Sequence, residues 1–421
     1  MTESLWRNRD YLLYRGGRTI SMLGSRMTAL AGPLLVLHMG GGAVWAGATG
    51  SCWFIAQMTM QLPAGYLSDR FDRRRLMLAM DAVRFVAIGS IPLAALFGFL
   101  TLPQLLVVVA VEGGASVVFS SAAMVFLRAL APGDQFPKAM SQSQFSMGAT
   151  TVLGPILGGA LFAVDRFLPF LVDVGSYVVS AAFLLAMSAR AEWSPTGARR
   201  SGNDGDGGED NRLTAGLRWL WHRPPVLRIV LFCMVLNLVG SASGVAALVV
   251  MTQHRISTGA IGVVMACSGY GVIAGSLIAT RAVKLGRWLF PLIGLLWAGS
   301  LAAVAVSASP WVVGAVLTLL AVLGPSTGVA MFKMLRDESP SEMYGRVLAG
   351  QQLIGTRLAT AGPMTAGLLI AALGGRYLWL LFAGTCLLAT ALTVGPLSSA
   401  RRSAADETPA PEQPAPAAQG A

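Results

Sequence analysis

The chain has 421 residues, of which 54% are hydrophobic and 12% are charged, with a formal net charge of +11. Because an average soluble domain carries roughly 25% charged residues, this composition argues against a water-soluble protein and for lipid as the main solvent. The basic residues lie at intervals beside apolar runs, which argues against nucleic acid as a partner and is typical of cytoplasmic loops of membrane proteins.

Twelve apolar runs are long enough to cross a bilayer, which takes roughly 20 helical residues for about 30 Å of hydrocarbon. Charges or Gly/Pro turns bound each run. The predicted spans are 12–38, 44–66, 76–99, 103–126, 143–164, 168–189, 227–251, 259–280, 288–307, 311–332, 347–373 and 377–397. The sequence therefore predicts an all-α membrane protein with twelve transmembrane helices.

The distribution of basic residues predicts the topology. Of the 31 Lys and Arg residues, 22 fall in the terminal segments and the connections after even-numbered spans, three fall in the opposite connections and six fall within spans, where Arg15, Arg18 and Arg228 lie near the same end as the 22. Lys and Arg are retained on the cytoplasmic side during insertion, so both termini are expected there. The stretch 1–18 is arginine-rich and has no apolar segment ending in a cleavage site, which predicts an uncleaved start.

The longest connection, 190–226, divides the predicted spans into a six-helix half at 1–189 and another at 227–400. We expect this linker to be cytoplasmic; its Leu/Trp part would either lie on lipid as an interfacial helix or remain a solvated linker. The tail, 401–421, is rich in Ala and Pro, and we expect it to be disordered.

The two halves share short sequence similarities. Gln144–Pro155 in the fifth span and Gln352–Pro363 in the eleventh are 208 residues apart and both end in Gly-Pro. Ala64–Leu67 and Ala274–Leu277 are 210 residues apart. Near-equal offsets at corresponding places predict duplicated, pseudo-symmetric halves, which are typical of transporters.

The connection after the second span is the most specific motif in the chain. Its sequence, Gly65-Tyr-Leu-Ser-Asp-Arg-Phe-Asp-Arg-Arg-Arg75, resembles the G-x-L-a-D-R-x-G-R-[RK] loop of the major facilitator superfamily, with Asp72 where the family usually has Gly. Retention of positive charge in the cytoplasm would explain the arginines but not Asp69.

The resemblance implies a role for this loop. In the family the loop latches the two halves in the outward-facing state, and Asp69 would then face the start of the eleventh span near Arg346. The resemblance assigns this latch role to Gly65, Asp69, Arg70 and Arg73. From the residues themselves, Gly65 would allow close helix approach and Asp69 could accept hydrogen bonds at a helix N-terminus.

A second motif lies in the fifth span and is similar to the G-P-x-x-G-G motif of the family's exporters. The residues are Gly154, Pro155, Gly158 and Gly159. Proline removes a helix hydrogen bond, and the glycines permit a bend and close packing. Generic small-residue packing would explain the same pattern, but its place in the fifth span favours export.

Two charges are predicted near the middle of spans that line the central cavity in this superfamily. A charge at the bilayer centre needs a partner or a water-filled cavity. We expect Arg26 in the first span and Glu112 in the fourth to face each other, with Glu112 alternately binding a proton and a cationic or hydrogen-bonding substrate. The alternative is a fixed salt bridge that only stabilises the N-terminal half.

Other polar residues within spans have less specific predictions. Asp81 and Arg84 are three residues apart and can pair on one helix face as a structural anchor. Asp173 and Arg357 are expected to be packed or cavity-edge charges. Asn237 would either line the cavity or bond to a neighbouring helix. Trp53 and Phe54, together with other apolar groups, would suit many amphipathic molecules.

No motif indicates an enzyme, a cofactor or a metal. The chain has no Walker loop and no H-E-x-x-H, and its cysteines lie inside apolar runs without C-x-x-C spacing. The composition, 28 arginines against three lysines, suggests a high-GC bacterial genome and hence the inner membrane. We predict a monomeric secondary exporter that exchanges protons for amphipathic molecules. A nutrient importer and a non-transporting scaffold or sensor are the alternatives.

Overall fold

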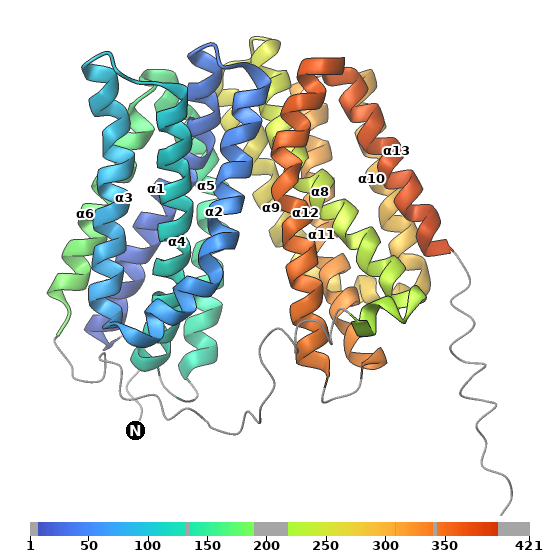
Figure 1. Ribbon diagram of the computed structural model, residues 1–421, viewed down its shortest axis with the longest axis horizontal. Coiled ribbons are helices and arrows are strands. Elements are labelled where there is room, and N and C mark those ends of the chain that lie inside the picture. The colour runs from blue at the N-terminus through green and yellow to red at the C-terminus, as the bar shows by residue number, and fades with distance from the viewer. Residues whose placement is uncertain are drawn as a thin grey trace, which may run out of the picture.

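The computed structural model describes residues 7–131, 133, 135–188, 218–307, 309–339 and 343–394. Long α-helices and one short 3-10 helix account for nearly all of these residues (Figure 1). The elements are α1 (Arg9–His38), α2 (Gly42–Arg70), α3 (Arg73–Leu96), α4 (Leu102–Leu130), α5 (Gln135–Val164), α6 (Leu168–Ala186), α8 (Pro224–Gln253), α9 (Thr258–Ala282), η3 (Val283–Trp288), α10 (Leu289–Val306), α11 (Pro310–Glu338), α12 (Tyr344–Leu373) and α13 (Gly375–Val394).

Each predicted span overlaps one of these α-helices, so the all-α membrane fold is confirmed. Ten helices within the described part of the chain are long and apolar enough to cross a membrane. The main errors are at helix ends, where polar turns extend beyond the apolar run. For example, α5 begins at Gln135 rather than at 143, and α11 continues to Glu338 rather than ending at 332.

The helices form two groups, α1–α6 and α8–α13, which lie side by side in Figure 1. Within the first group α1 packs against α5 and α6, and α4 packs against α2 and α3; within the second, α8 packs against α12 and α9 against α11. The groups meet mainly where α2 contacts α12 and α5 contacts α9. The predicted linker is described only from residue 218 onward and the tail 401–421 lies outside the described residues, so those boundaries stay predictions.

One end of the bundle carries most of the arginines that lie in the described residues, and we call it the arginine-rich end. There α1 begins at Arg9, α2 ends at Arg70 and α3 begins at Arg73. The turn between α2 and α3 is short because Asp72 caps α3: its Oδ1 accepts a hydrogen bond from the Arg75 backbone N–H at 2.8 Å. The residue that departs from the family pattern is therefore a helix cap.

The predicted repeat forms a pair of equivalent contacts between the groups. A Cβ on Gly159 of α5 would overlap the Thr258 carbonyl of α9, and a Cβ on Gly367 of α12 would overlap the Ala43 carbonyl of α2. Gly159 and Gly367 are 208 residues apart, the offset found in the sequence. A cross-group hydrogen bond also joins the Met364 N–H to Ser51 Oγ at 2.9 Å. Small residues at these positions allow the backbones to touch.

Candidate functional site

Three helices of the first group bring ionisable side chains together inside the bundle. We call Asp81, Arg84, Glu112, Asp173 and Tyr177 the Arg84 cluster. Asp81 and Arg84 come from α3, Glu112 from α4, and Asp173 and Tyr177 from α6, and all five are at most 8% exposed. Charges at this depth in a membrane are costly unless they are paired, so their arrangement decides what the site can do.

Arg84 is the centre of the cluster. Its Nη2 donates to Glu112 Oε1 at 3.0 Å and to Ser25 Oγ at 2.6 Å. Its Nη1 lies 3.9 Å from Asp81 Oδ1, and its guanidinium carbon lies 4.5 Å from the centroid of the Tyr177 ring. The guanidinium thus joins α1, α3, α4 and α6 through charge-assisted hydrogen bonds and a cation–π contact.

Glu112 and Asp81 differ in how well their oxygens are satisfied. Glu112 Oε2 accepts from the Trp53 indole N–H at 2.7 Å, so both of its oxygens have donors. Asp81 Oδ2 accepts from Ser180 at 2.7 Å, but its buried Oδ1 has no hydrogen-bond partner within the described residues. A buried carboxylate oxygen without a donor is unfavourable, whereas a proton on Asp81 would remove the charge.

Asp173 lies in a shell of hydroxyl groups. Its Oδ2 accepts from Thr28 at 2.7 Å and from Tyr177 at 3.1 Å, and its Oδ1 accepts from Ser176 at 3.2 Å. The Tyr177 hydroxyl is also 3.2 Å from Ser25 Oγ, which receives a hydrogen bond from Arg84. A continuous chain of polar atoms therefore connects Asp173 to Glu112.

The charges in this cluster do not balance. The cluster contains three carboxyl groups and one guanidinium: Asp81 and Glu112 lie within 4.0 Å of Arg84, and Asp173 connects to it through Tyr177 and Ser25. Full ionisation would leave an excess of negative charge in the membrane interior. Arg26 is close enough to interact electrostatically with Glu112, but no ion pair within 4.0 Å joins them in the described structure. Since uncompensated buried charge is costly, the cluster is suited to holding protons.

The predicted partner of Glu112 was wrong. Glu112 pairs with Arg84, whereas Arg26 is exposed, and its Cβ packs where Gly154 leaves space on α5. Sequence position gave the depth of each residue along its helix but not the direction in which its side chain points. The predicted pair of Asp81 and Arg84 is present at 3.9 Å, and Asp173 is fully buried.

The structure places the predicted latch residues at the arginine-rich end of α2 and α3. Asp69 is exposed, and Arg70 contacts its neighbour Tyr66 through the hydroxyl and the ring. A Cβ on Gly65 would meet open space, so the expected close helix approach is not seen in this conformation. The side chain of Arg346 lies outside the described residues, and the latch stays a prediction.

The G-P-x-x-G-G segment of α5 lies between α1 and α9. Gly154 and Gly158 pack on the backbone of Arg26 and Met27 in α1, where a Cβ on Gly158 would be 3.0 Å from the Met27 carbonyl oxygen. Gly159 packs on α9, where a Cβ would be 2.9 Å from Gly262 Cα. Pro155 lies inside the helix. The predicted close packing is present; its link to export stays a prediction.

For two other predicted residues, Asn237 and Arg357, the described part of the structure shows no contact that indicates a role. Asn237 is exposed on α8, and the side chain of Arg357 lies outside the described residues. Trp53, predicted only as a candidate for binding amphipathic molecules, is the donor to Glu112 and packs edge-on against Phe54 at 5.1 Å.

Sequence reasoning also missed a signal in α6. Asp173, Ser176, Tyr177 and Ser180 repeat at helical spacing in an otherwise apolar span, and this stripe faces the Arg84 cluster.

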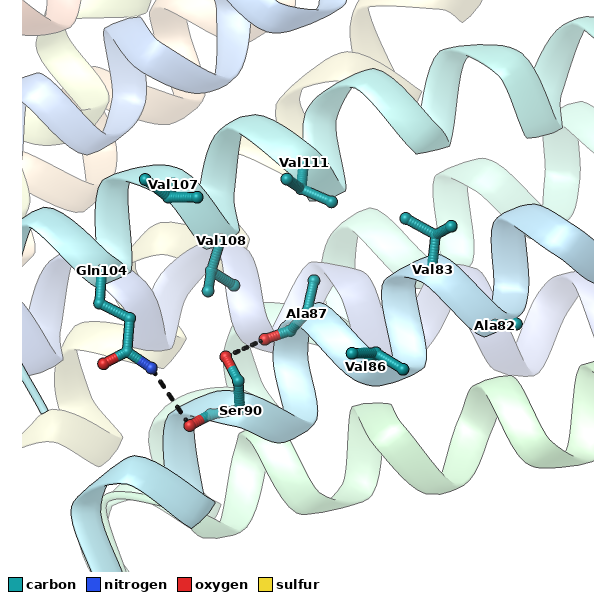
Figure 2. Close-up of a pocket in the computed structure, with 9 residues that line it drawn as sticks. All are labelled: Ala82, Val83, Val86, Ala87, Ser90, Gln104, Val107, Val108 and Val111. Atoms are coloured by element: carbon teal, nitrogen blue, oxygen red, sulfur yellow. Dashed lines mark hydrogen bonds between the residues drawn. The ribbon is translucent and has the colours of Figure 1, made fainter. Parts of the chain in front are cut away.

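A cavity of about 580 Å³ lies between α3 and α4 (Figure 2). Its lining is almost entirely Ala and Val, and Val83 and Val111 are the sequence neighbours of Arg84 and Glu112. The two polar side chains in its wall bond to backbone, Gln104 Nε2 to the Ser90 carbonyl at 3.3 Å and Ser90 Oγ to the Ala87 carbonyl at 2.7 Å. Among the described residues no charged side chain lines this cavity, so it is separate from the charge chemistry of the cluster.

Comparisons with known proteins agree with this architecture. The chain matches the sequence profile of the Major Facilitator Superfamily over residues 16–247. It is 25% identical over 396 residues to the uncharacterized MFS-type transporter YfiS of Bacillus subtilis (strain 168), covering 88% of this chain and 89% of the relative. It is 24% identical over 368 residues to the multidrug efflux pump Tap of Mycobacterium tuberculosis (strain ATCC 25618 / H37Rv), covering 83% of each.

Solved structures show the same fold. The nucleoside transporter NupG superposes with a TM-score of 0.71 at 11% identity, covering 92% of this chain and 98% of that one. A bacterial homologue of the iron transporter ferroportin in its inward-facing state superposes with a TM-score of 0.68 at 18% identity, covering 93% and 99%. With its apolar helices, its two helix groups and a profile match over more than half its length, the chain belongs to the Major Facilitator Superfamily and is a multi-pass membrane transporter.

Proposed function

We propose that this transporter exports small amphipathic molecules across the bacterial inner membrane in exchange for protons. The similarity to the efflux pump Tap and the G-P-x-x-G-G segment of α5 support export. The observation that carries proton coupling is the Arg84 cluster, which contains three buried carboxyl groups but one guanidinium. Such a cluster changes its net charge when a proton arrives or leaves, which is what a coupling site must do.

Glu112 is the carboxyl group that we assign to proton exchange. At 8% it is the most exposed of the three carboxyl residues, compared with 1% for Asp81 and 0% for Asp173. A proton on Glu112 would remove the charge attraction between Glu112 and Arg84. Asp81, which lies 3.9 Å from Arg84 Nη1, would then be the remaining carboxylate partner of this guanidinium within the cluster. Because Arg84 links α3 to three other helices, this exchange would change how α1, α4 and α6 pack and so bias the conformation.

The contacts between the helix groups support alternating access. One tight glycine contact joins the end of α5 to the start of α9, and the other joins α12 to the start of α2. The Ser51–Met364 hydrogen bond lies beside the second contact, and Ser51 is about 27 Å along α2 from Asp69 by the rise of an α-helix. We assign the arginine-rich end to the cytoplasm and expect the latch to close there when the glycine contacts open. Both termini would then be cytoplasmic, and a monomer would contain the whole pathway.

Transport direction distinguishes export from the alternatives. Everted membrane vesicles, energised to be acidic inside, should accumulate a fluorescent amphipathic dye, and right-side-out vesicles should not. Glu112→Gln should abolish the dependence on the proton gradient, whereas Glu338→Gln, the same chemical change at an exposed pair with Arg223, should leave it intact. Accumulation only in right-side-out vesicles would favour an importer. Absence of flux in both, with a normally folded protein, would favour a scaffold or sensor.

A further inference from the structure

Arg26 is a cation in the middle of α1 that the Arg84 cluster does not use. It is exposed even though Gly154 of α5 packs against its Cβ and Glu112 is near enough to interact with it. Within the described residues no carboxylate lies within ion-pairing distance of its guanidinium. An accessible charge inside a helix bundle indicates a water-filled space and the possibility of binding a ligand of opposite charge.

The spans offer no accessible carboxylate for a positively charged substrate. Asp81, Glu112 and Asp173 are the acidic residues in the interior of the first six spans, and all three are buried in the Arg84 cluster. Both oxygens of Glu112 already accept hydrogen bonds. The spans of the second half contain no carboxylate, because the sequence has no Asp or Glu at 211–336 or at 343–405.

The same helix carries two more arginines toward the arginine-rich end. Arg15 and Arg18 line a small cavity between α1, α4 and α5, together with tyrosine and serine hydroxyl groups. Arg15 donates to Gln142 at 2.9 Å, and the buried Nε of Arg18 has no hydrogen-bond partner in the described structure. Arg26 lies 11 residues after Arg15, about three helical turns, so the two lie on nearly the same face of α1.

We propose that the exported amphipathic molecule is an anion, whose carboxylate- or sulfonate-type head group binds Arg26 after passing Arg15 and Arg18. This inference rests on the proposed export function and specifies its substrate class. A guanidinium suits such a head group because its fixed N–H groups can donate two parallel hydrogen bonds to two oxygens. The apolar remainder of the molecule would lie against the apolar residues of the pathway.

The charge of the substrate has an energetic consequence. When an anion leaves the cell and a proton enters, both movements carry positive charge inward. An inside-negative membrane potential therefore drives the exchange, and its rate should rise as that potential is increased. A cationic substrate exchanged for one proton would show no such dependence.

Binding to the purified full-length protein in nanodiscs tests the assignment directly. The probes are three dansyl-labelled alkyl compounds of one chain length that end in a sulfonate, a hydroxyl or a trimethylammonium group. Wild-type protein should bind the sulfonate most tightly. Arg26→Gln should weaken sulfonate binding by about 10- to 100-fold, the usual effect of losing a charge-assisted hydrogen bond, and leave hydroxyl binding unchanged.

Two further variants complete the test. Arg26→Lys keeps the charge but loses the two-point geometry, and it should retain part of the affinity for the sulfonate. Arg376→Gln removes an exposed arginine at the start of α13 and should change nothing. Equal or tighter binding of the trimethylammonium probe, or equal loss of all three probes in Arg26→Gln and Arg26→Lys, would overturn the proposal.

Transport of the same probes in vesicles separates this inference from the function on which it rests. Arg26-dependent binding of the sulfonate without movement of any probe would contradict export and retain the anion site. Export of the trimethylammonium probe that does not depend on Arg26 would confirm export and overturn the anion assignment.

Discussion

Substitution of Gly159 by alanine should shift the transporter away from the conformation described here. The new Cβ would lie 2.9 Å from Gly262 Cα and closer still to the Thr258 carbonyl oxygen. Both neighbours are backbone atoms, so no side chain can rotate away and α5 must move from α9. Overpacking of this kind costs about 1–3 kcal/mol, which corresponds to a roughly 5- to 150-fold change in a two-state population.

Distance measurements between spin labels can detect this shift. Labels at Val164, the exposed end of α5, and at His254, just before α9, would follow the separation of the two groups in a variant without the native cysteines. Gly159→Ala should move the distance distribution toward longer values. Gly175→Ala, where a Cβ meets open space, is the matched control.

The repeat supplies an independent version of this experiment. Gly367→Ala at the equivalent contact of α12 with α2 should produce the same opening between its own pair of helices. Unchanged distance distributions in both glycine variants would refute the idea that these contacts hold the two groups together.

Three other substitutions test the cluster and the loop through thermal unfolding in detergent and through transport. Arg84→Leu should destabilise the fold by about 3–5 kcal/mol because it leaves buried carboxyl groups unpaired. The double variant Arg84→Leu/Glu112→Leu should recover part of this loss, and equal destabilisation by the single and double variants would contradict the pairing. Trp53→Phe removes the indole donor to Glu112, which should lower the free energy of unfolding by about 1.5–3 kcal/mol and alter the pH dependence of transport. A variant with wild-type stability and pH profile would show that this hydrogen bond is unimportant. Asp72→Ala should lower stability by about 0.5–2 kcal/mol whereas Asp72→Asn should not, and an equal effect of both would rule out the capping role.

Much of the fold could be predicted from the sequence because a bilayer imposes simple requirements. A span must be apolar for about 20 residues, and basic residues gather at one side, so the apolar runs located every long α-helix of the described residues, with errors of up to eight residues where polar turns extend the helix, as at the start of α5. The repeat was also readable, since Gly-Pro recurs at an offset of 208 residues and the structure places both copies at contacts between the groups.

The contacts within the Arg84 cluster could be predicted only in part from the sequence. The sequence identified the buried charges, but the side on which each lies depends on how the helices are rotated and packed, and Glu112 therefore received the wrong partner. The contribution of Trp53 comes from a different helix and leaves no trace in spacing. The polar stripe on α6 could have been found, because Asp173, Ser176, Tyr177 and Ser180 follow the helical period within an apolar span.

Proton movement coupled to substrate is the most direct test of the central claim. Purified transporter would be reconstituted in vesicles with a pH-sensitive dye inside, and amphipathic compounds would be added under an imposed proton gradient. The account predicts that a transported compound moves protons in the opposite direction and that Glu112→Gln abolishes this signal while Glu338→Gln preserves it. Substrate flux without any proton signal, or an equal signal in the Glu112→Gln variant, would contradict proton coupling at the Arg84 cluster.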